Sequence, residues 1–337
     1  MTPERRAAFA NLVAGFCQEA AAGDLVLVEV VAATAAVGRS VAEALGARGA
    51  EALLVDLDDP RGAATDEALW RRLTGYVSLR TVAAAPADRP EPSATVRQLR
   101  MTLRKTSTYL PDVALAARAG MSEAQLADYY AGLLHLDDPD PVVGFHALRD
   151  RQEALLARLR AARTVRIEGD GTDLTLSTAG RGWVNSYGRR NVPSGEMYTS
   201  PVETSAHGVI RFDVPSYNFP ERVAGVTLEF DRGRLERATA VEGEATLTRR
   251  LAVDAGARVV GELGIGGNER MTRFLGATLF DEKTAGTVHL ALGKSYPQTG
   301  GLNDSALHWD LIKDLRGGGR ISLDGEIFAE NGVFVGA

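Results

Sequence analysis

The hydrophobic pattern of this 337-residue chain changes at about residue 164. Before that point, apolar runs typical of buried strands alternate with helical patterns, which predicts parallel strand–helix–strand units. After it, short segments alternate apolar and polar residues with period two between glycine-rich turns, which predicts antiparallel hairpins. We therefore expect an α/β, Rossmann-like N-terminal domain and an α+β, mostly antiparallel β-rich C-terminal domain. In the N-terminal part, strands are expected at 25–31, 52–57 and 76–82, and helices at 5–21 and 37–48.

The length of the chain exceeds what a single hydrophobic core usually supports, so two domains are expected. A proline-rich loop at 84–95 is followed by helical patterns. Residues 136–141 contain two prolines and predict a linker, because proline disfavours helix around it. A long helix is expected at 143–162, and we place the domain boundary near it. The predicted domains are residues 1–150 and 151–337.

The C-terminal half is expected to consist of short strands joined by tight turns. A hairpin is predicted where the glycine-containing turn at 169–173 separates two alternating segments. The predicted strands are 165–168, 174–178, 209–214, 226–230, 235–241, 259–263, 287–292, 320–323 and 326–329, with a helix at 244–255.

Composition excludes several classes of function. The 38 basic and 44 acidic residues give a formal net charge of −6, which argues against nucleic acid or an anionic membrane as the partner. The single cysteine, Cys17, excludes a disulfide framework and a thiolate zinc site. No signal peptide or membrane-spanning run is read from the sequence, so a cytoplasmic location is expected. The turn after the first strand lacks the G-x-G-x-x-G pattern, which argues against a dinucleotide cofactor.

Four short segments carry side chains suited to metal binding. His289 lies in an otherwise apolar strand pattern, while His308 and Asp310 are spaced to point to one face of an extended segment. Glu196 lies in a turn-rich loop, and Glu262 lies in an apolar, glycine-rich stretch where an unpaired carboxylate would be costly. Taken singly, each residue reads as a core histidine or a loop acid. Together they form a nitrogen and oxygen ligand set that suits a dinuclear zinc, cobalt or manganese hydrolase.

Several motifs in sequence order resemble the aminopeptidase T / aminopeptidase S family, the thermophilic-type, leucyl aminopeptidase-like metallo-aminopeptidases. The resemblance covers most of the chain and is strongest at 164–334. The motifs are residues 171–175, 191–196 (Asn-Val-Pro-Ser-Gly-Glu), 262–266 (Glu-Leu-Gly-Ile-Gly), 281–283 (Asp-Glu-Lys), 286–293, 295–296 (Ser-Tyr) and 308–310 (His-Trp-Asp).

The resemblance implies a specific metal centre. Its ligands would be Glu196, Glu262, His289, His308 and Asp310, holding two divalent ions (Zn, Co or Mn) with Asp310 as a bridge. Apart from the resemblance, the Asp-Glu-Lys triplet is read as a loop whose Glu282 is a candidate to support these ligands indirectly.

The resemblance also implies catalytic roles and partners. Tyr296 occupies the position of the family's active-site tyrosine, and its phenol would donate a hydrogen bond to a developing oxyanion. Glu196 or Glu262 would carry a proton to the leaving amine. The substrate would be a peptide or a peptide-like amide. The N-terminal domain would be a scaffold, the C-terminal domain would be catalytic, and the protein would be a homodimer whose sites face an internal cavity.

Two other readings stay open at this point. The same fold is similar to 2,5-dihydroxypyridine dioxygenase, a ring-cleaving enzyme with one Fe(II) held by a His/His/Asp triad. The presence of both Glu196 and Glu262 beside His289 favours two metals over one. A protein that kept the fold without activity is disfavoured, because every ligand type is retained. The chain also looks shorter than typical family members, so its substrate cavity is expected to differ.

Overall fold

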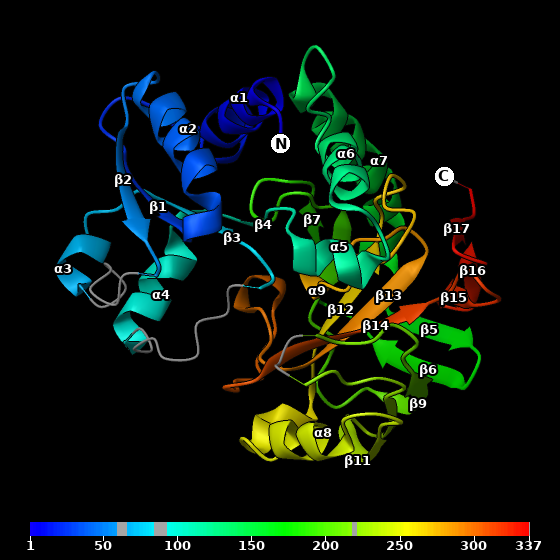
Figure 1. The fold of residues 1–337 in the computed structure, drawn as a ribbon. Coiled ribbons are helices and arrows are strands. Elements are labelled where there is room, and N and C mark those ends of the chain that lie inside the picture. The colour runs from blue at the N-terminus through cyan, green and yellow to red at the C-terminus, as the bar shows by residue number, and fades with distance from the viewer. Residues whose placement is uncertain (59–65, 84–92, 218–220, 337) are drawn as a thin grey trace. The chain divides into compact units, whose positions relative to one another are not determined.

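The structure, a computed structural model, describes residues 1–58, 66–83, 93–217 and 221–336 (Figure 1). Most of the proline-rich loop expected at 84–95 therefore lies outside the described residues. The chain divides into two compact units. Unit 1 comprises Met1–His146 and Gly188–Ser194, and unit 2 comprises Ala147–Tyr187 and Gly195–Ala337. The domain roles expected on either side of residue 150 stay predictions.

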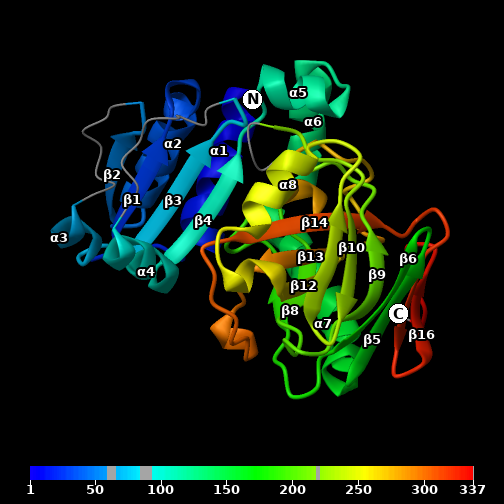
Figure 2. The same cartoon turned by 90° about the horizontal axis from the view of Figure 1, so that it is seen from below.

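Unit 1 is built on a four-stranded parallel sheet in the order β2-β1-β3-β4, which Figure 2 shows side by side. The expectation of a parallel α/β arrangement in the N-terminal part is confirmed. Its strands are β1 (Leu25–Val30), β2 (Glu51–Asp56), β3 (Gly75–Arg80) and β4 (Arg104–Tyr109). Its helical segments are α1 (Pro3–Leu12), the π-helical turn Val13–Cys17, the 3-10 turn Ala32–Thr34, α2 (Ala35–Gly46), α3 (Glu67–Trp70), α4 (Ala94–Thr102), α5 (Val113–Ala119) and α6 (Glu123–Leu133).

Two strands of this sheet differ from the sequence expectation. β2 was expected to be buried, but it lies at the edge of the sheet, and Leu54 is 40% exposed. β4 was not predicted, because its sequence, Arg-Lys-Thr-Ser-Thr-Tyr, lacks the apolar run that identifies an inner strand. It is the other edge strand, and it buries Thr106 and Thr108 in place of aliphatic side chains. Edge position explains both differences, since an edge strand needs less apolar surface.

The long helix α7 (Pro141–Ala161) begins inside the segment expected to be a linker. Pro141 is its first residue, a position where proline fits because the first N–H of a helix has no intrahelical acceptor. Its C-terminal part belongs to unit 2 and places Leu155, Leu156 and Leu159 in the core.

Unit 2 contains an eight-stranded and a five-stranded sheet, and every pairing in both is antiparallel. The eight-stranded sheet has the order β11-β10-β9-β6-β5-β15-β16-β17, formed by Arg234–Thr239, Thr227–Asp231, His207–Arg211, Thr172–Ser177, Thr164–Gly169, Arg320–Leu323, Glu326–Glu330 and Val333–Phe334. The five-stranded sheet has the order β14-β13-β12-β8-β7, formed by His308–Asp314, Thr287–Gly293, Val260–Gly266, Glu196–Thr199 and Val184–Ser186. The remaining helical segments are α8 (Glu244–Leu251), α9 (Thr278–Asp281) and the 3-10 turns Ala255–Arg258 and Pro297–Thr299.

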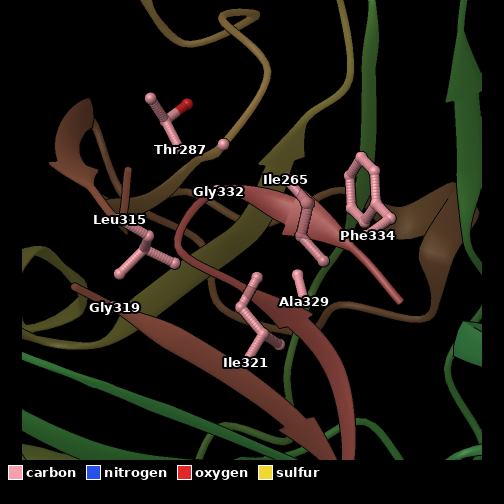
Figure 3. A pocket seen from close by; sticks show the side chains of 9 residues that line it. Ile265, Thr287, Leu315, Gly319, Ile321, Ala329, Gly332 and Phe334 are labelled. Carbon is pink, nitrogen blue, oxygen red and sulfur yellow. The ribbon is translucent and has the colours of Figure 1, made fainter. Parts of the chain in front are cut away.

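One apolar core joins the two sheets of unit 2. Ile167 and Leu174 from the eight-stranded sheet belong to the same buried cluster as Leu263 and Leu290 from the five-stranded sheet. Between the sheets lies an apolar cavity of about 10 Å³, lined by Ile265, Leu315, Ile321, Ala329 and Phe334 among others (Figure 3). That volume holds about one water molecule, so the cavity is a packing gap and cannot hold a substrate.

Among the described residues, none of the helices combines the length and the apolar character needed to cross a bilayer.

Packing of the core between the sheets predicts a stability difference that can be measured. Leu174 is fully buried on β6, whereas Leu302 is 81% exposed. The variant Leu174→Ala is expected to lower the free energy of unfolding by about 2–5 kcal/mol, because it removes buried methyl groups and leaves a cavity. Leu302→Ala is the matched control and should change it by less than about 0.5 kcal/mol. Equal effects of the two variants in urea unfolding would contradict this account of the core.

Candidate metal centre

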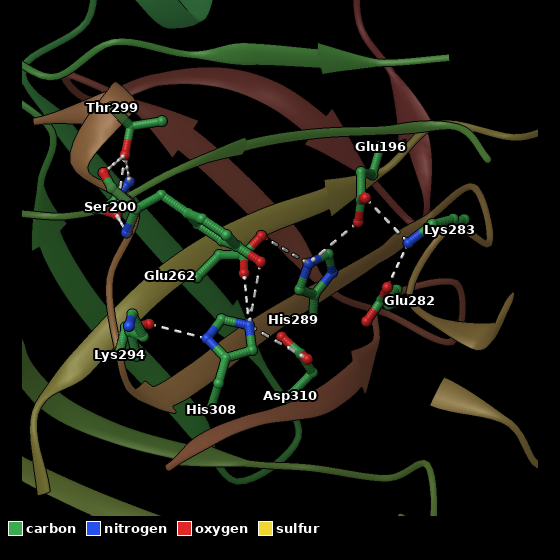
Figure 4. Close-up of polar contacts among 11 residues, drawn as sticks. Glu196, Ser200, Glu262, Glu282, Lys283, His289, Lys294, Thr299, His308 and Asp310 are labelled. Atoms are coloured by element: carbon green, nitrogen blue, oxygen red, sulfur yellow. Dashed lines mark hydrogen bonds and ion pairs between the residues drawn. The ribbon is translucent and has the colours of Figure 1, made fainter. Parts of the chain in front are cut away.

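One face of the five-stranded sheet gathers the side chains that sequence analysis singled out (Figure 4). Residues paired across neighbouring strands share a face, and alternate residues along a strand return to it. His308 and Asp310 on β14 pair with Gly293 and Ala291 on β13, and Ala291 also pairs with Glu262 on β12. His289 pairs with Gly264 and Glu196 pairs with Gly266, so both side chains lie on this same face of the sheet.

Small residues on this face make room for the functional side chains. A Cβ atom on Gly264 would lie 2.0 Å from Nε2 of His289, so only glycine leaves space for the imidazole there. A bulge between Val260 and Glu262 interrupts the pairing with β13, and a Cβ on Gly261 would lie 2.3 Å from the carbonyl oxygen of Gly293. Such a bulge re-aims the side chain that follows it. The glycine-rich sequence around Glu262 is therefore a requirement of the site.

Glu262 lies between the two histidines. Its Oε1 is 3.6 Å from Nε2 of His289, and its Oε2 is 3.2 Å from Nε2 of His308. Nε2 of His289 is also 3.5 Å from Oε2 of Glu196, and Nε2 of His308 is 3.6 Å from Oδ2 of Asp310. Five side chains from four strands thus place their donor atoms within a few ångströms of one another.

These donors form three overlapping groups in which all ligand atoms lie within 4.8 Å: Glu196, Glu262 and His289; Glu262, His308 and Asp310; Glu282, His289 and Asp310. We call the six residues the acid–histidine cluster. Glu262, His289 and Asp310 each belong to two groups. The remaining histidines, His135, His146 and His207, belong to none of the groups found among the described residues.

Glu196 was expected in a turn-rich loop, and that expectation is wrong. It is the first residue of β8 and is 5% exposed. The preceding Gly195 adopts a φ of +134°, and a Cβ there would lie 2.6 Å from Cβ of Asn268. Turn-forming residues therefore precede the strand, and they misled the sequence reading about the residue that follows them.

Lys283 is a buried partner of the cluster that sequence analysis did not identify as part of the site. Its side chain is 0% exposed, and its Nζ lies 3.0 Å from Oε1 of Glu196 and forms an even closer ion pair with Glu282. Asp281, the first residue of the same triplet, accepts hydrogen bonds from the backbone N–H groups of residues 275–277, which fixes the segment that carries Glu282 and Lys283. The sequence signal that could have found Lys283 is the Asp-Glu-Lys triplet, which places acids beside the lysine. A lysine this deeply buried needs such acidic partners.

Tyr296 lies beside the cluster. Its phenol oxygen is 3.4 Å from Nε2 of His308, and its ring packs against those of His308 and Tyr198 with centroid distances of 5.3 and 5.0 Å. Nδ1 of His308 lies 2.8 Å from the carbonyl oxygen of Lys294. Donation of the Nδ1 proton to that carbonyl leaves Nε2 directed at Glu262, Asp310 and Tyr296.

The electrostatics of the cluster favour positive charge. Burial alone would raise the pKa of Glu262, but the close approach of the imidazoles of His289 and His308 outweighs it and lowers that pKa to about 2. Burial opposes protonation of both histidines, yet the surrounding carboxylates raise the pKa of His289 to about 9 and that of His308 to about 10. Burial raises the pKa of the other carboxylates, Glu196, Glu282 and Asp310.

The donor set fits divalent cations. Nδ1 of His289 and Oδ1 of Asp310 are buried and have no hydrogen-bond partner among the described residues, which is costly for polar atoms unless something else binds there. Carboxylate oxygens and imidazole nitrogens without thiolates suit zinc, cobalt and manganese. Four carboxylates against the single ammonium of Lys283 also leave negative charge that a cation would neutralise.

A family model decides the classification. The model of the thermophilic metalloprotease (M29) family matches residues 77–331. The chain belongs to this family. Membership implies the use of a divalent metal, and the matched residues include every member of the acid–histidine cluster.

Curated relatives of this M29 chain carry aminopeptidase names. "Aminopeptidase T" of Thermus thermophilus is 31% identical over 177 residues, which cover 48% of this chain and 43% of the relative. "Aminopeptidase 2" of Geobacillus stearothermophilus is 28% identical over 222 residues, covering 57% of this chain and 52% of the relative. The matched segments thus span about half the length of these relatives.

Solved structures extend the likeness in fold to the whole chain. Wild-type AmpT from Thermus thermophilus superposes with a TM-score of 0.78 at 20% identity, covering 98% of this chain and 99% of that chain. The 2,5-dihydroxypyridine dioxygenase from Pseudomonas putida superposes with a TM-score of 0.63 at 15% identity, covering 100% and 99%. At these identities the likeness establishes the fold and leaves the reaction to be argued from the site.

The histidine environments predict a titration that can be observed directly. In protein stripped of metal by a chelator, the imidazole NMR signals of His289 and His308 are expected to titrate near pH 9 and pH 10, above the ordinary 6.5. Because these folded-state pKa values are raised, the stability they contribute is full below about pH 6.5 and is lost as the pH rises through 9 and 10. The variant Glu262→Gln should lower both pKa values. Titration of both imidazoles near pH 6.5 would contradict the geometry of the cluster.

Proposed function

We propose that this chain is a metal-dependent aminopeptidase that removes N-terminal residues from peptides or cleaves a peptide-like amide. The observation that carries the proposal is the buried acid–histidine cluster on one sheet face of a chain that belongs to a metalloprotease family. The aminopeptidase names of the relatives support the same class of reaction.

We assign the metal ligands as Glu196, Glu262, His289, His308 and Asp310, and we propose two divalent ions, Zn, Co or Mn. When bound, such ions polarise a carbonyl group and make water acidic enough to attack at neutral pH. Glu262 and Asp310 are both candidates for a bridging carboxylate, because each belongs to two of the overlapping groups. Glu282 is a further carboxylate within reach of His289 and Asp310.

The residues around these ligands have distinct proposed roles. Tyr296 donates its phenolic proton as a hydrogen bond to the oxyanion that develops when the scissile carbonyl is attacked. Whichever of Glu196 and Glu262 is not fully engaged by metal accepts the proton of the attacking water and passes it to the leaving amine. Lys283 holds Oε1 of Glu196, which directs Oε2 toward His289. Burial favours all three roles, because hydrogen bonds and charges act more strongly where water is excluded.

The wider organisation rests on the family resemblance and is proposed with it. Residues 1–150 serve as a scaffold domain and residues 151–337 as the catalytic domain. The protein is proposed to act as a cytoplasmic homodimer on a peptide or amide substrate, with neither nucleic acid nor a membrane as partner.

The variant Glu262→Gln tests the proposed catalytic role. It keeps the size of the side chain and removes its charge and its ability to accept a proton. It is expected to lower kcat on an aminoacyl p-nitroanilide by about 10²–10⁴-fold, the usual contribution of acid–base catalysis. Steady-state kinetics with saturating zinc, cobalt or manganese measure the effect, and circular dichroism checks that the fold is kept.

The matched control is Glu236→Gln, which makes the same chemical change at an exposed position on β11. It should leave kcat unchanged. Turnover of Glu262→Gln at the wild-type rate would rule out the proposed role of this carboxylate.

A ring-cleaving dioxygenase with one Fe(II) is the second candidate, because its fold also superposes on the whole chain. A mononuclear iron triad needs two histidines and one carboxylate, whereas this cluster adds three further carboxylates.

Metal analysis separates the two candidates. Purified protein is expected to carry close to two equivalents of zinc, cobalt or manganese, and chelation should abolish aminopeptidase activity until one of these metals is returned. One equivalent of iron together with oxygen consumption on a dihydroxypyridine would instead establish the dioxygenase.

A further inference from the structure

A second concentration of unusual polar side chains lies in unit 1, on one face of the parallel sheet. Tyr76 on β3 pairs with Leu27 on β1 and Lys105 on β4, so these side chains share a face. Near the amino ends of the strands this face is apolar and packs against Trp70, Val96 and neighbouring residues. Toward the carboxyl ends it becomes polar, with Glu29, Ser78, Ser107 and Arg80 in register. Arg80 is the last residue of β3 and lies at the carboxyl edge, where α/β proteins usually bind ligands, whereas Lys105 is the second residue of β4.

Glu29 is the buried acid at this edge, and its oxygens are already engaged. It is 1% exposed, and its Oε2 accepts a 2.5 Å hydrogen bond from the phenol of Tyr76. Nη2 of Arg100 lies 3.2 Å from Oε1, and Nη2 of Arg80 lies 3.6 Å from Oε2. The guanidinium of Arg100 also stacks 4.5 Å from the ring of Trp70, which holds it in place.

Three cations act on the ammonium of Lys105, namely Arg80, Arg100 and Arg190, and we call these four residues the basic cluster. Arg190 is tied to β4 because its carbonyl oxygen accepts the N–H of Ser107 at 2.7 Å. Lys105 has no hydrogen-bond or ion-pair partner among the residues that the structure describes. Nε of Arg100 is likewise buried and unpaired within the described ranges. Burial, together with the charges of Arg80, Arg100 and Arg190, lowers the pKa of Lys105.

Partly buried like charges repel, and an unpaired buried donor has lost its hydration without recovering a hydrogen bond. The single negative charge of Glu29 cannot neutralise all four cations, and its oxygens already bind Tyr76, Arg80 and Arg100. A bound anion would supply both the missing charge and the missing acceptors. We propose that Lys105, Arg80 and Arg190 of unit 1 bind an oxyanion, the phosphate or carboxylate group of a small ligand, with Arg100 as support.

Titration of the full-length protein with inorganic phosphate and, separately, with acetate tests the site at constant ionic strength. Saturable binding is expected by calorimetry, with shifts in the backbone NMR signals of Ser78 and Ser107. Lys105→Met and Arg190→Gln should each weaken binding by about tenfold or more, because each removes a charged hydrogen-bond donor. Binding of phosphate alone identifies a phosphate ester as the ligand class, and binding of acetate as well identifies a carboxylate.

Arg39→Gln provides the matched control, because Arg39 is exposed on α2 of the same unit and its loss changes the net charge equally. Its affinity for either anion should equal that of the wild type. Without added anion, Lys105→Met should raise the midpoint of thermal unfolding, because it relieves repulsion inside the basic cluster. Absence of saturable binding, equal weakening by Arg39→Gln, or a lowered midpoint for Lys105→Met would each overturn the proposal. None of these results bears on the aminopeptidase proposal, which rests on other residues.

Discussion

The register of the five-stranded sheet is the constraint on which the candidate metal centre depends. Alternate residues of β12, β13 and β14 point into the apolar core, where Leu263, Leu290 and Leu311 are almost completely buried. Most of the residues between them carry the donors or are small, and Ile312, which pairs with His289, is an exception. A shift of one residue in β13 would exchange His289 for Leu290, which would expel a leucine from the core and bury a histidine there. The free energy that fixes the core therefore also fixes the relative positions of the ligands, so the metal centre needs no separate scaffold.

The charge of the buried carboxylates is the second constraint. It opposes folding, whereas the packing that fixes the strand register favours it. Four carboxylates brought together under low exposure repel each other and lose hydration. Lys283 compensates part of this charge through Glu196 and Glu282, and the raised pKa values of His289 and His308 mean that protons compensate more of it. Divalent cations would replace those protons with stronger ligand bonds. The cluster is thus assembled at the expense of stability unless cations bind, which is typical of sites selected for chemistry and not for packing.

The parts of the fold that follow a local hydrophobic period could be predicted from sequence. The strand at 25–31 and the strands containing His289 and Glu262 were predicted because long apolar runs identify inner strands. β4 and β8 were missed because a polar edge strand and a four-residue strand after a turn carry almost no such signal. The placement of His308 and Asp310 on the same face of one strand follows from their spacing of two residues alone. The ion pair of Lys283 with Glu196 joins residues far apart in the sequence and depends on the register of whole strands, which no local pattern specifies.

The fold by itself does not decide the reaction, since an aminopeptidase and a ring-cleaving dioxygenase both superpose on this chain. The difference must lie in what the common sheet face presents. Two histidines and one carboxylate suffice for a single iron, but Glu196, Glu262 and Glu282 add oxygens and negative charge that one divalent ion cannot satisfy. The overlap of the three donor groups through Glu262, His289 and Asp310 provides shared ligands, which two neighbouring cations require. The number of buried carboxylates, more than the histidines or the fold, therefore favours hydrolysis over oxygenation.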